Sequence, residues 1–150
     1  MSLTDDPVAR TQMLIRRPVS AVFEAFVDPA ITSKFWFTRG SARVEPAKKI
    51  TWHWDMYGVS AEVLVKAVEQ DRRILVEWPT PVEWVFDPRP GDATLVTITA
   101  SGFAGTDDEM VAQALDSMGG FSFVLAGCKA YLEHGVPLNL VADHDPDSQA

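Results

Sequence analysis

The feature that most restricts the fold of this chain is one long helix close to its C-terminal end. The sequence TDDE at 106–109 has the pattern of a capping box, with Thr106 as N-cap and Glu109 reaching back to it. Gly135 and Pro137 are typical of a helix end. Between these limits, apolar residues recur at intervals of three and four positions: Met110, Ala114, Met118, Phe121, Leu125, Cys128 and Leu132. A helix over 107–134 is about 40 Å long at ~1.5 Å per residue, enough to cross a whole sheet.

A succession of strands precedes this helix. A first strand is predicted at 11–17, and the later ones are predicted at 41–45, 50–56, 59–69, 73–78, 82–87 and 93–101. The connections between the later strands are short and rich in Gly, Pro and Asp, which favours antiparallel pairing because parallel strands need long crossovers. Trp84 and Phe86 alternate with Glu83 and Asp87, which indicates one buried and one wet face.

Two short helices are predicted between the first strand and the rest. Pro18 suits a first helical position, and an apolar stripe follows it: Val19, Val22, Phe23, Phe26 and Val27. Asp28 is a good N-cap and Pro29 a good first residue for the second helix. The order predicts an α+β fold in which a curved antiparallel sheet wraps around the long terminal helix. We expect one domain over 1–150, with 1–10 and 141–150 as tails.

Composition excludes several classes of function. The formal net charge is −8 and the basic residues do not cluster, so we expect no nucleic-acid partner. No uninterrupted apolar run approaches the ~18 residues of a membrane span, and MSLTDDPVARTQ lacks the pattern of a signal peptide. A cytoplasmic location is therefore expected. Cys128 is the single cysteine, which excludes an intramolecular disulfide and a cysteine metal cluster.

The stretch KITWHWDMYG at 49–58 offers either a catalytic strand or the aromatic wall of a pocket. Successive side chains of a strand point to opposite faces, so one face would carry Ile50, Trp52, Trp54 and Met56, and the other Thr51, His53 and Asp55. If the apolar face grips the long helix, Trp52 and Trp54 point inward, and His53 and Asp55 point to solvent. No serine completes a triad, so no catalytic residue is assigned.

A metal site is also not expected, and no cofactor is predicted. Asp143, His144 and Asp145 are adjacent, and three consecutive residues of an extended tail cannot converge on one ion. His134 lies at the C-terminal end of the long helix, where a cation is favoured electrostatically.

The aromatic content is the strongest signal of function. These side chains either fill the core or line a partly open apolar pocket, which is the usual lining of ligand sites. The predicted ligand-binding residues are Phe23, Phe26, Phe35, Trp36, Trp52, Trp54, Trp78, Trp84, Phe86, Met118, Phe121 and Leu125. Gly119-Gly120 in the long helix indicates either close packing or a bend, or room for a ligand. Inward polar groups could come from Glu62, Glu77, Thr97 or Thr99, depending on strand phase.

Four segments in order carry a resemblance to a known family. They are RRPVSAVFEAFVDPAITSKFWF (16–37), VEQDRRILVEW (68–78), ATLVTITASGF (93–103) and YLEHGVPLNLVADHDPD (131–147). The chain resembles the START-like, or Bet v 1-like, superfamily with its helix-grip fold, within the branch named after the C-terminal domain of the activator of Hsp90 ATPase. Two places depart from the branch. Gly120-Phe121 stands where the branch often has Gly-Trp, and 46–49 where it tends to have a Gly-Gly turn.

The resemblance and the aromatic residues together imply three alternative functions. The first is non-enzymatic binding of a small hydrophobic molecule, such as a lipid, polyketide or aromatic metabolite. The second is a cyclase or hydratase, which would need a titratable group with a shifted pKa inside the cavity. The third is a protein-interaction module with a chaperone partner of the Hsp90 type, an analogy of fold and name. The oligomeric state is left open.

Overall fold

The computed structural model describes residues 3–149. They form the elements β1 (Ala9–Ile15), α1 (Val19–Val27), α2 (Pro29–Thr32), β2 (Arg39–Gly40), β3 (Lys49–Trp54), a 3₁₀ turn at Asp55–Tyr57, β4 (Val59–Glu69), β5 (Arg73–Glu77), β6 (Pro81–Arg89), β7 (Ala93–Ala100), α3 (Asp107–His134), α4 (Leu140–Asp143) and a 3₁₀ turn at Pro146–Ser148. The seven strands form one antiparallel sheet in the order β1-β7-β6-β5-β4-β3-β2.

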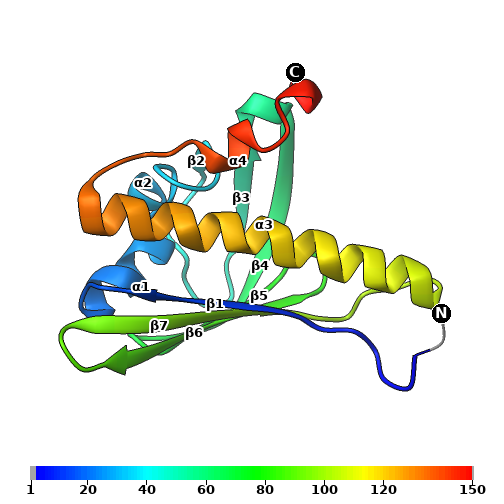
Figure 1. Ribbon diagram of the computed structural model, residues 1–150, viewed down its shortest axis with the longest axis horizontal. Helices are drawn as coiled ribbons and strands as arrows, with labels where there is room; N and C mark the ends of the chain where they lie inside the picture. The colour runs from blue at the N-terminus through cyan, green and yellow to red at the C-terminus, as the bar shows by residue number, and fades with distance from the viewer. Residues whose placement is uncertain (1–2, 150) are drawn as a thin grey trace.

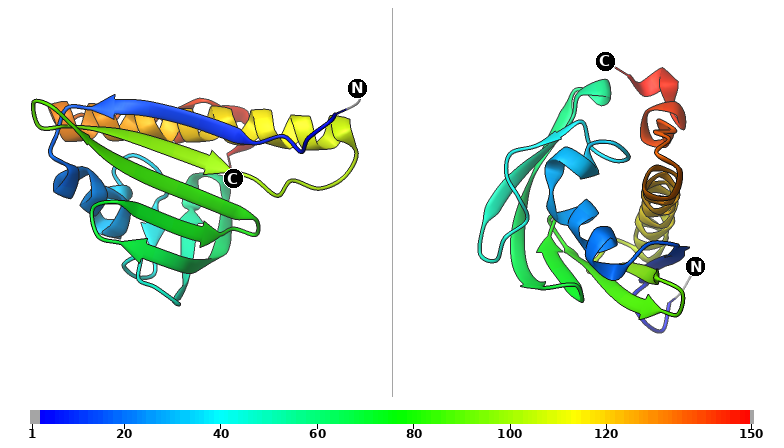
Figure 2. Two further views of the ribbon diagram at one scale, coloured as in Figure 1. Left: turned by 90° about the horizontal axis from the view of Figure 1, so that it is seen from below. Right: turned by 90° about the vertical axis from the view of Figure 1, so that its left-hand side faces the viewer.

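The sheet curves around α1 and α2, and α3 lies across its open side (Figures 1 and 2). This is the helix-grip arrangement, and it confirms the predicted fold class. The side chains that alternate along β6 and β7 are buried on the concave face, among them Trp84, Phe86, Val96 and Ile98. Burial of one face follows from the period of two along each strand.

The long helix has the predicted limits. The Thr106 hydroxyl accepts a hydrogen bond from the Glu109 backbone N–H, and the Glu109 carboxylate accepts one from the Thr106 N–H, which completes the capping box. Gly135 ends the helix at φ +67°, a left-handed conformation that suits glycine. Within residues 3–149, α3 is also the one helix long and apolar enough to cross a membrane, and its buried stripe faces the sheet.

The stripe on α3 differs from the predicted one at Met118, whose side chain is 45% exposed. At 100° per residue, position 118 lies at the edge of the stripe, and the helix there is beside the pocket described below rather than the packed core. Gly127 belongs to the buried face instead, because a Cβ at this position would lie 3.2 Å from Phe35. This glycine allows α3 to approach the end of α2 closely.

The predicted strand at 41–45 is wrong. The strand pairing with β3 covers Arg39 and Gly40, and the chain leaves the sheet edge after Ser41, whose N–H still donates to the Thr51 carbonyl. The Val44 N–H donates to the Val27 carbonyl, and its buried side chain anchors the segment over the end of α1. Ala47 follows in a left-handed turn at φ +61°. The alternating sequence of 41–45 is thus overruled by the anchoring of Val44 in the core.

The predicted strand at 50–56 is two residues too long. β3 ends at Trp54, and Asp55–Tyr57 turn into a 3₁₀ helix closed by Gly58 at φ +65°. Ile50, Trp52 and Trp54 are buried as the alternation predicts, whereas Met56 lies outside the strand and is half-buried.

The tail predicted at 141–150 is structured over its described residues. The chain turns back after α3, and α4 lies next to it near the β3–β4 turn (Figure 1). The Tyr57 hydroxyl shares its one proton between the backbone carbonyls of Val141 and Ala142, which are half-buried in the one-turn helix α4. A tyrosine distant in sequence therefore helps to order this segment, together with the His144 Nδ1–H and Gln149 Nε2–H groups, which donate to the same two carbonyls. At the other end, β1 already begins at Ala9, inside the tail predicted at 1–10.

Candidate ligand-binding site

A pocket of about 300 Å³ lies between the middle of α3 and the end of the sheet where β6 begins and β7 finishes. Its lining is drawn from every layer of the fold and comprises Trp36, Trp78, Thr80, Val82, Ala100, Phe103, Asp116, Ser117, Gly120, Phe121, Phe123, Val124, Val141 and His144. The volume is at the lower end of the range for small-molecule sites, and the lining is mostly apolar and aromatic, as in such sites.

One face of α3 forms the roof of this pocket. Ser117, Gly120, Phe121 and Val124 are spaced by one, three and four residues, so they lie on neighbouring parts of the helix surface. A Cβ built at Gly120 meets no atom within 4 Å, and the same holds at Gly119. The glycine pair therefore does not serve close packing. At Gly120 it leaves the helix backbone bare toward the pocket.

The floor of the pocket belongs to a cluster that contains all five tryptophans of the chain. Trp36 is at its centre, with ring centroids 4.8 Å from Trp52, 6.1 Å from Trp54, and 5.9 Å from both Trp78 and Trp84. Trp54 and Trp78 stack at 5.3 Å with an angle of 8° between their planes. This network holds Trp36 and Trp78 in place as a preformed aromatic surface.

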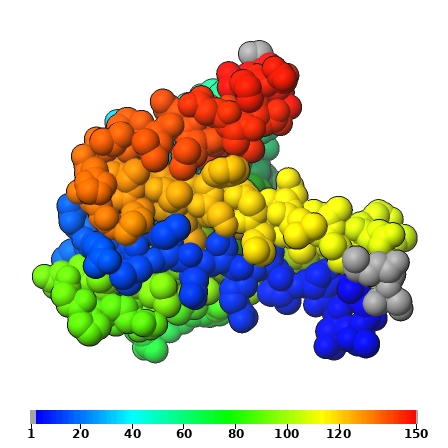
Figure 3. Space-filling view, viewed as in Figure 1, coloured from blue at the N-terminus to red at the C-terminus, as the bar shows by residue number. Residues whose placement is uncertain are grey.

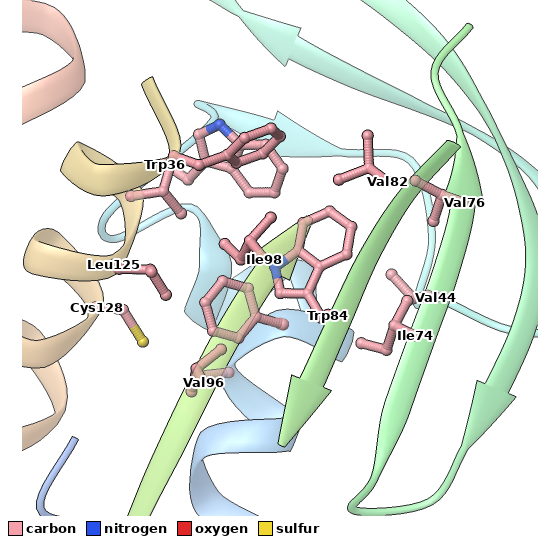
Figure 4. Packing of buried hydrophobic residues seen from close by; sticks show 14 of the residues in the cluster. Trp36, Val44, Ile74, Val76, Val82, Trp84, Val96, Ile98, Leu125 and Cys128 are labelled. Atoms are coloured by element: carbon pink, nitrogen blue, oxygen red, sulfur yellow. The ribbon is translucent and has the colours of Figure 1, made fainter. Parts of the chain in front are cut away.

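The core behind this surface is filled. Leu125 and Cys128 point from α3 toward Trp84, Ile98 and Val96 (Figure 4). The space left between Phe26, Trp36, Val44, Trp52, Ile74, Val76 and Trp84 is about 10 Å³, about one water-sized probe. Burial raises the pKa of the Cys128 thiol, which keeps it protonated and unreactive.

The predicted ligand-binding residues divide between the pocket and this core. Trp36, Trp78 and Phe121 line the pocket. The remaining nine do not: Phe23, Phe26, Phe35, Trp52, Trp54, Trp84, Phe86 and Leu125 are buried in the core, and Met118 is exposed on α3. Ligand contact by each of the twelve stays a prediction, and for the eight buried residues the packing supplies a structural role.

The sequence interpretation missed several lining residues. Phe103 follows the last strand in a loop, Phe123 lies off the apolar stripe of α3, and Val141 and His144 were placed in a tail. Phe123 carried a signal, since a phenylalanine outside the buried stripe needs another reason to be there. Its ring lies 5.0 Å from that of His144.

Few polar groups line the pocket, and those with titratable side chains are exposed. Asp116 and His144 are both in contact with solvent, and Thr80 and Ser117 supply hydroxyls. The His144 Nδ1 lies 2.7 Å from the Val141 carbonyl, which accepts its proton. The pocket thus holds orienting groups at its rim and no buried carboxylate or imidazole.

The four polar residues proposed as inward handles lie on the other face of the sheet. Glu62 and Glu77 are within 4.0 Å and 3.7 Å of Lys49 and Lys66, and Arg10 donates to the Thr99 hydroxyl. Thr97 and Thr99 alternate with the buried Val96, Ile98 and Ala100. The strand phase therefore excludes all four from the pocket.

His53 and Asp55 do not form a pair. His53 is half-buried on the convex side of β3, and Asp55 lies in the following 3₁₀ turn, where Arg39 donates to its carboxylate at 3.1 Å. No group of three or more His, Cys, Asp or Glu side chains within residues 3–149 could hold a metal ion. The pocket is accordingly the best candidate for a functional site.

Comparison with solved structures places this architecture among known proteins. A protein from Staphylococcus saprophyticus, SSP2350, is 34% identical, with a TM-score of 0.79 over 88% of this chain and 96% of its own. DynU16, a protein of the dynemicin biosynthetic locus, is 22% identical with a TM-score of 0.72, and the match covers 89% of this chain and 49% of that one. Aha1 from Colwellia psychrerythraea, solved as a dimer, is 15% identical with a TM-score of 0.72 over 86% of this chain and 98% of its own.

The last two likenesses concern the fold alone. No curated protein matches the chain in sequence. The family model described as activator of Hsp90 ATPase homolog 1-like protein matches residues 16–133, from just after β1 to the last turn of α3. The chain therefore belongs to the family of activator of Hsp90 ATPase homolog 1-like proteins, on the Bet v 1-like fold.

Proposed function

We propose that this protein binds a small hydrophobic molecule in the pocket between α3 and the sheet. The observation that carries the proposal is the bare helix surface at Gly120 opposite the aromatic floor of Trp36 and Trp78. A preformed apolar cavity of about 300 Å³ gains binding free energy from each methylene it takes from water. The resemblance of the fold to DynU16, a protein from a biosynthetic locus, is consistent with a small-molecule ligand.

The experiment is a titration with N-phenyl-1-naphthylamine, a neutral apolar dye, followed by tryptophan emission. We expect saturable binding and quenching, because Trp36 and Trp78 line the pocket and all five tryptophans are in contact with one another through Trp36. Gly120→Leu places a side chain in the pocket. If it displaces about two methylenes of contact at ~0.8 kcal/mol each, the dissociation constant rises roughly tenfold.

Gly119→Leu is the matched control. Both glycines lie within α3 with open space at the Cβ position, but Gly119 does not line the pocket. Each substitution replaces a glycine in a helix interior with a better helix former. This stabilises the helix by up to about 1 kcal/mol, so both variants should fold. Equal dye affinity in the two variants, or no saturable binding in the parent, would contradict the proposal.

The cyclase or hydratase alternative finds less support. It requires a desolvated acid or base facing the substrate, and the two such groups at the pocket, Asp116 and His144, are both exposed. The protein-interaction alternative has one observation in its favour, the exposed side chains of Leu115 and Met118 on α3. Stimulation of an Hsp90 ATPase that is lost in a Leu115→Glu variant would support it over ligand binding.

A further inference from the structure

A second cavity of about 160 Å³ is lined in part by α4. Its apolar walls come from Phe35, Phe37, Met56, Leu140 and Ala142, and its rim is polar, with Ser33, Lys34, Thr38 and Asn139. This cavity is separate from the pocket described above, and the predicted ligand-binding residues include only Phe35 and Trp36 of its lining. Its walls combine the segment after α2, the 3₁₀ turn after β3 and the C-terminal segment.

The two cavities share two residues. Trp36 and Val141 line both of them, so the cavities adjoin at these two residues, which we call the partition. Trp36 is held by its contacts with four other tryptophans, whereas Val141 is half-buried in the one-turn helix α4. The movable part of the partition is therefore Val141 and the segment that carries it.

That segment, which we call the strap (residues 135–149), is lightly attached. Gly135 and Asn139 have left-handed backbones at its two bends, and Val136 and Leu138 between them are each 45% exposed. The strap is joined to the body by the Tyr57 hydroxyl at the Val141 and Ala142 carbonyls, by the ring contacts of His144 with Phe123 and Tyr57, and by the half-buried Val141 side chain, which packs against the core. The strap also lies beyond residues 16–133 that match the family model. Few buried contacts are the mark of a segment that opens locally.

We propose that the two cavities are the two halves of one binding site for an elongated, predominantly apolar molecule, which is admitted when the strap lifts Val141 away from Trp36. One part of the ligand lies between the aromatic floor of Trp36 and Trp78 and the bare α3 surface at Gly120, and the other lies in the second cavity against Met56 and Leu140. Its polar end reaches the rim at Ser33 and Lys34. The inference rests on the proposed function and adds the shape of the ligand to it.

The test is a series of straight-chain primary alcohols of increasing length that compete with N-phenyl-1-naphthylamine. Affinity should rise roughly fourfold per methylene while each added group is buried, and stop rising once the site is full. Ala142→Leu narrows the second cavity from α4, and Ser33→Leu narrows it from the end of α2. We expect both variants to bind short alcohols as the parent does and to stop gaining affinity at a shorter chain length.

Ala30→Leu is the control, because Ala30 is exposed on α2 and lines neither cavity. It should keep the parent's chain-length profile. The same limiting length in the parent, Ala142→Leu and Ser33→Leu would overturn the two-part site while leaving binding in the first pocket intact. A parent that binds no dye and no alcohol would remove the proposed function and this inference together.

The strap's part is tested separately with Tyr57→Phe, which removes the hydroxyl and keeps the ring. Loss of this hydrogen bond should accelerate association of a long alcohol with the protein. Association of a short alcohol should be unchanged, because only the long one needs Val141 to move. Equal acceleration for both lengths, or for neither, would overturn the role of the strap in admitting the ligand.

Discussion

At the scale of single residues, Trp54 and His53 show how much the two faces of β3 differ in burial. Trp54 stacks on Trp78 and is buried, whereas the neighbouring His53 is half-buried on the convex side with no side-chain hydrogen bond among those found. The alternation alone predicts this division, since the two residues are adjacent in a strand.

Trp54→Ala and His53→Ala should therefore differ greatly in stability. Truncation of a buried tryptophan costs about 3–5 kcal/mol, and substitution on the convex side usually changes the free energy of unfolding by about 0.5 kcal/mol. Urea unfolding of the two variants measures both values. A similar loss in each would show that His53 and Trp54 do not lie on opposite faces of β3 in this way.

At the scale of elements, the central part and the C-terminal half of α3 have different roles. Its C-terminal half packs into the core with Leu125 and Cys128, while its central part roofs the pocket at Gly120 and Phe121. Glu133 in its last turn fastens the helix to the end of β1: its carboxylate accepts hydrogen bonds from the Arg16 backbone N–H at 2.7 Å and from Lys129 at 2.6 Å.

This attachment should make stability depend on pH. Burial acts to raise the pKa of Glu133, but the hydrogen bonds from Arg16 and Lys129 and the charge of Lys129 outweigh it and lower the pKa below its usual value. A carboxylate with a lowered folded-state pKa contributes stability that is fully present above the unfolded pKa of about 4.3 and is lost as the pH falls through the lower folded value.

Glu133→Gln should consequently destabilise the protein at pH 7 by about 1–3 kcal/mol, and the difference from the parent should shrink when unfolding is measured below about pH 4. Glu45→Gln is the control, since Glu45 is exposed and pairs only with Lys48 three residues away among the described ion pairs. A Glu133→Gln penalty that is the same at both pH values would rule out this linkage.

At the scale of the whole molecule, stability is distributed unevenly. The strands β5, β6 and β7 are paired with neighbours on both sides and carry buried side chains such as Ile74, Trp84 and Val96. The strap lies at the opposite extreme, along the edge of the molecule above α3 (Figure 3), and none of its residues is fully buried.

Hydrogen exchange should resolve these two regions. We expect the amides of Asp143 and His144, which are bonded within α4, to exchange through local opening, and those of β6 and β7 to exchange through global unfolding. Tyr57→Phe should accelerate exchange in the strap and leave the rates of β6 and β7 unchanged. Acceleration throughout the sheet would mean that the strap and the core open as one unit.

The sequence by itself determined the elements and the faces that they bury. The capping box at Thr106, the stripe through Phe121 and Leu125, and the alternation of Trp84 and Phe86 were sufficient for the helix-grip fold, because these patterns depend on local periodicity and capping. The same patterns identified Trp36, Trp78 and Phe121 among the candidates, but did not separate pocket from core.

Only the tertiary structure decided that separation. Whether an aromatic ring fills the core or faces a cavity depends on the space between elements that are distant in sequence, and no periodicity encodes it. A side chain at Gly120 would meet open space because no element packs on that part of α3. A side chain at Gly127 would meet Phe35, which packs directly against the helix there. The strap was misjudged for the same reason: its order comes in part from Tyr57, more than eighty residues away, through bonds to the Val141 and Ala142 carbonyls.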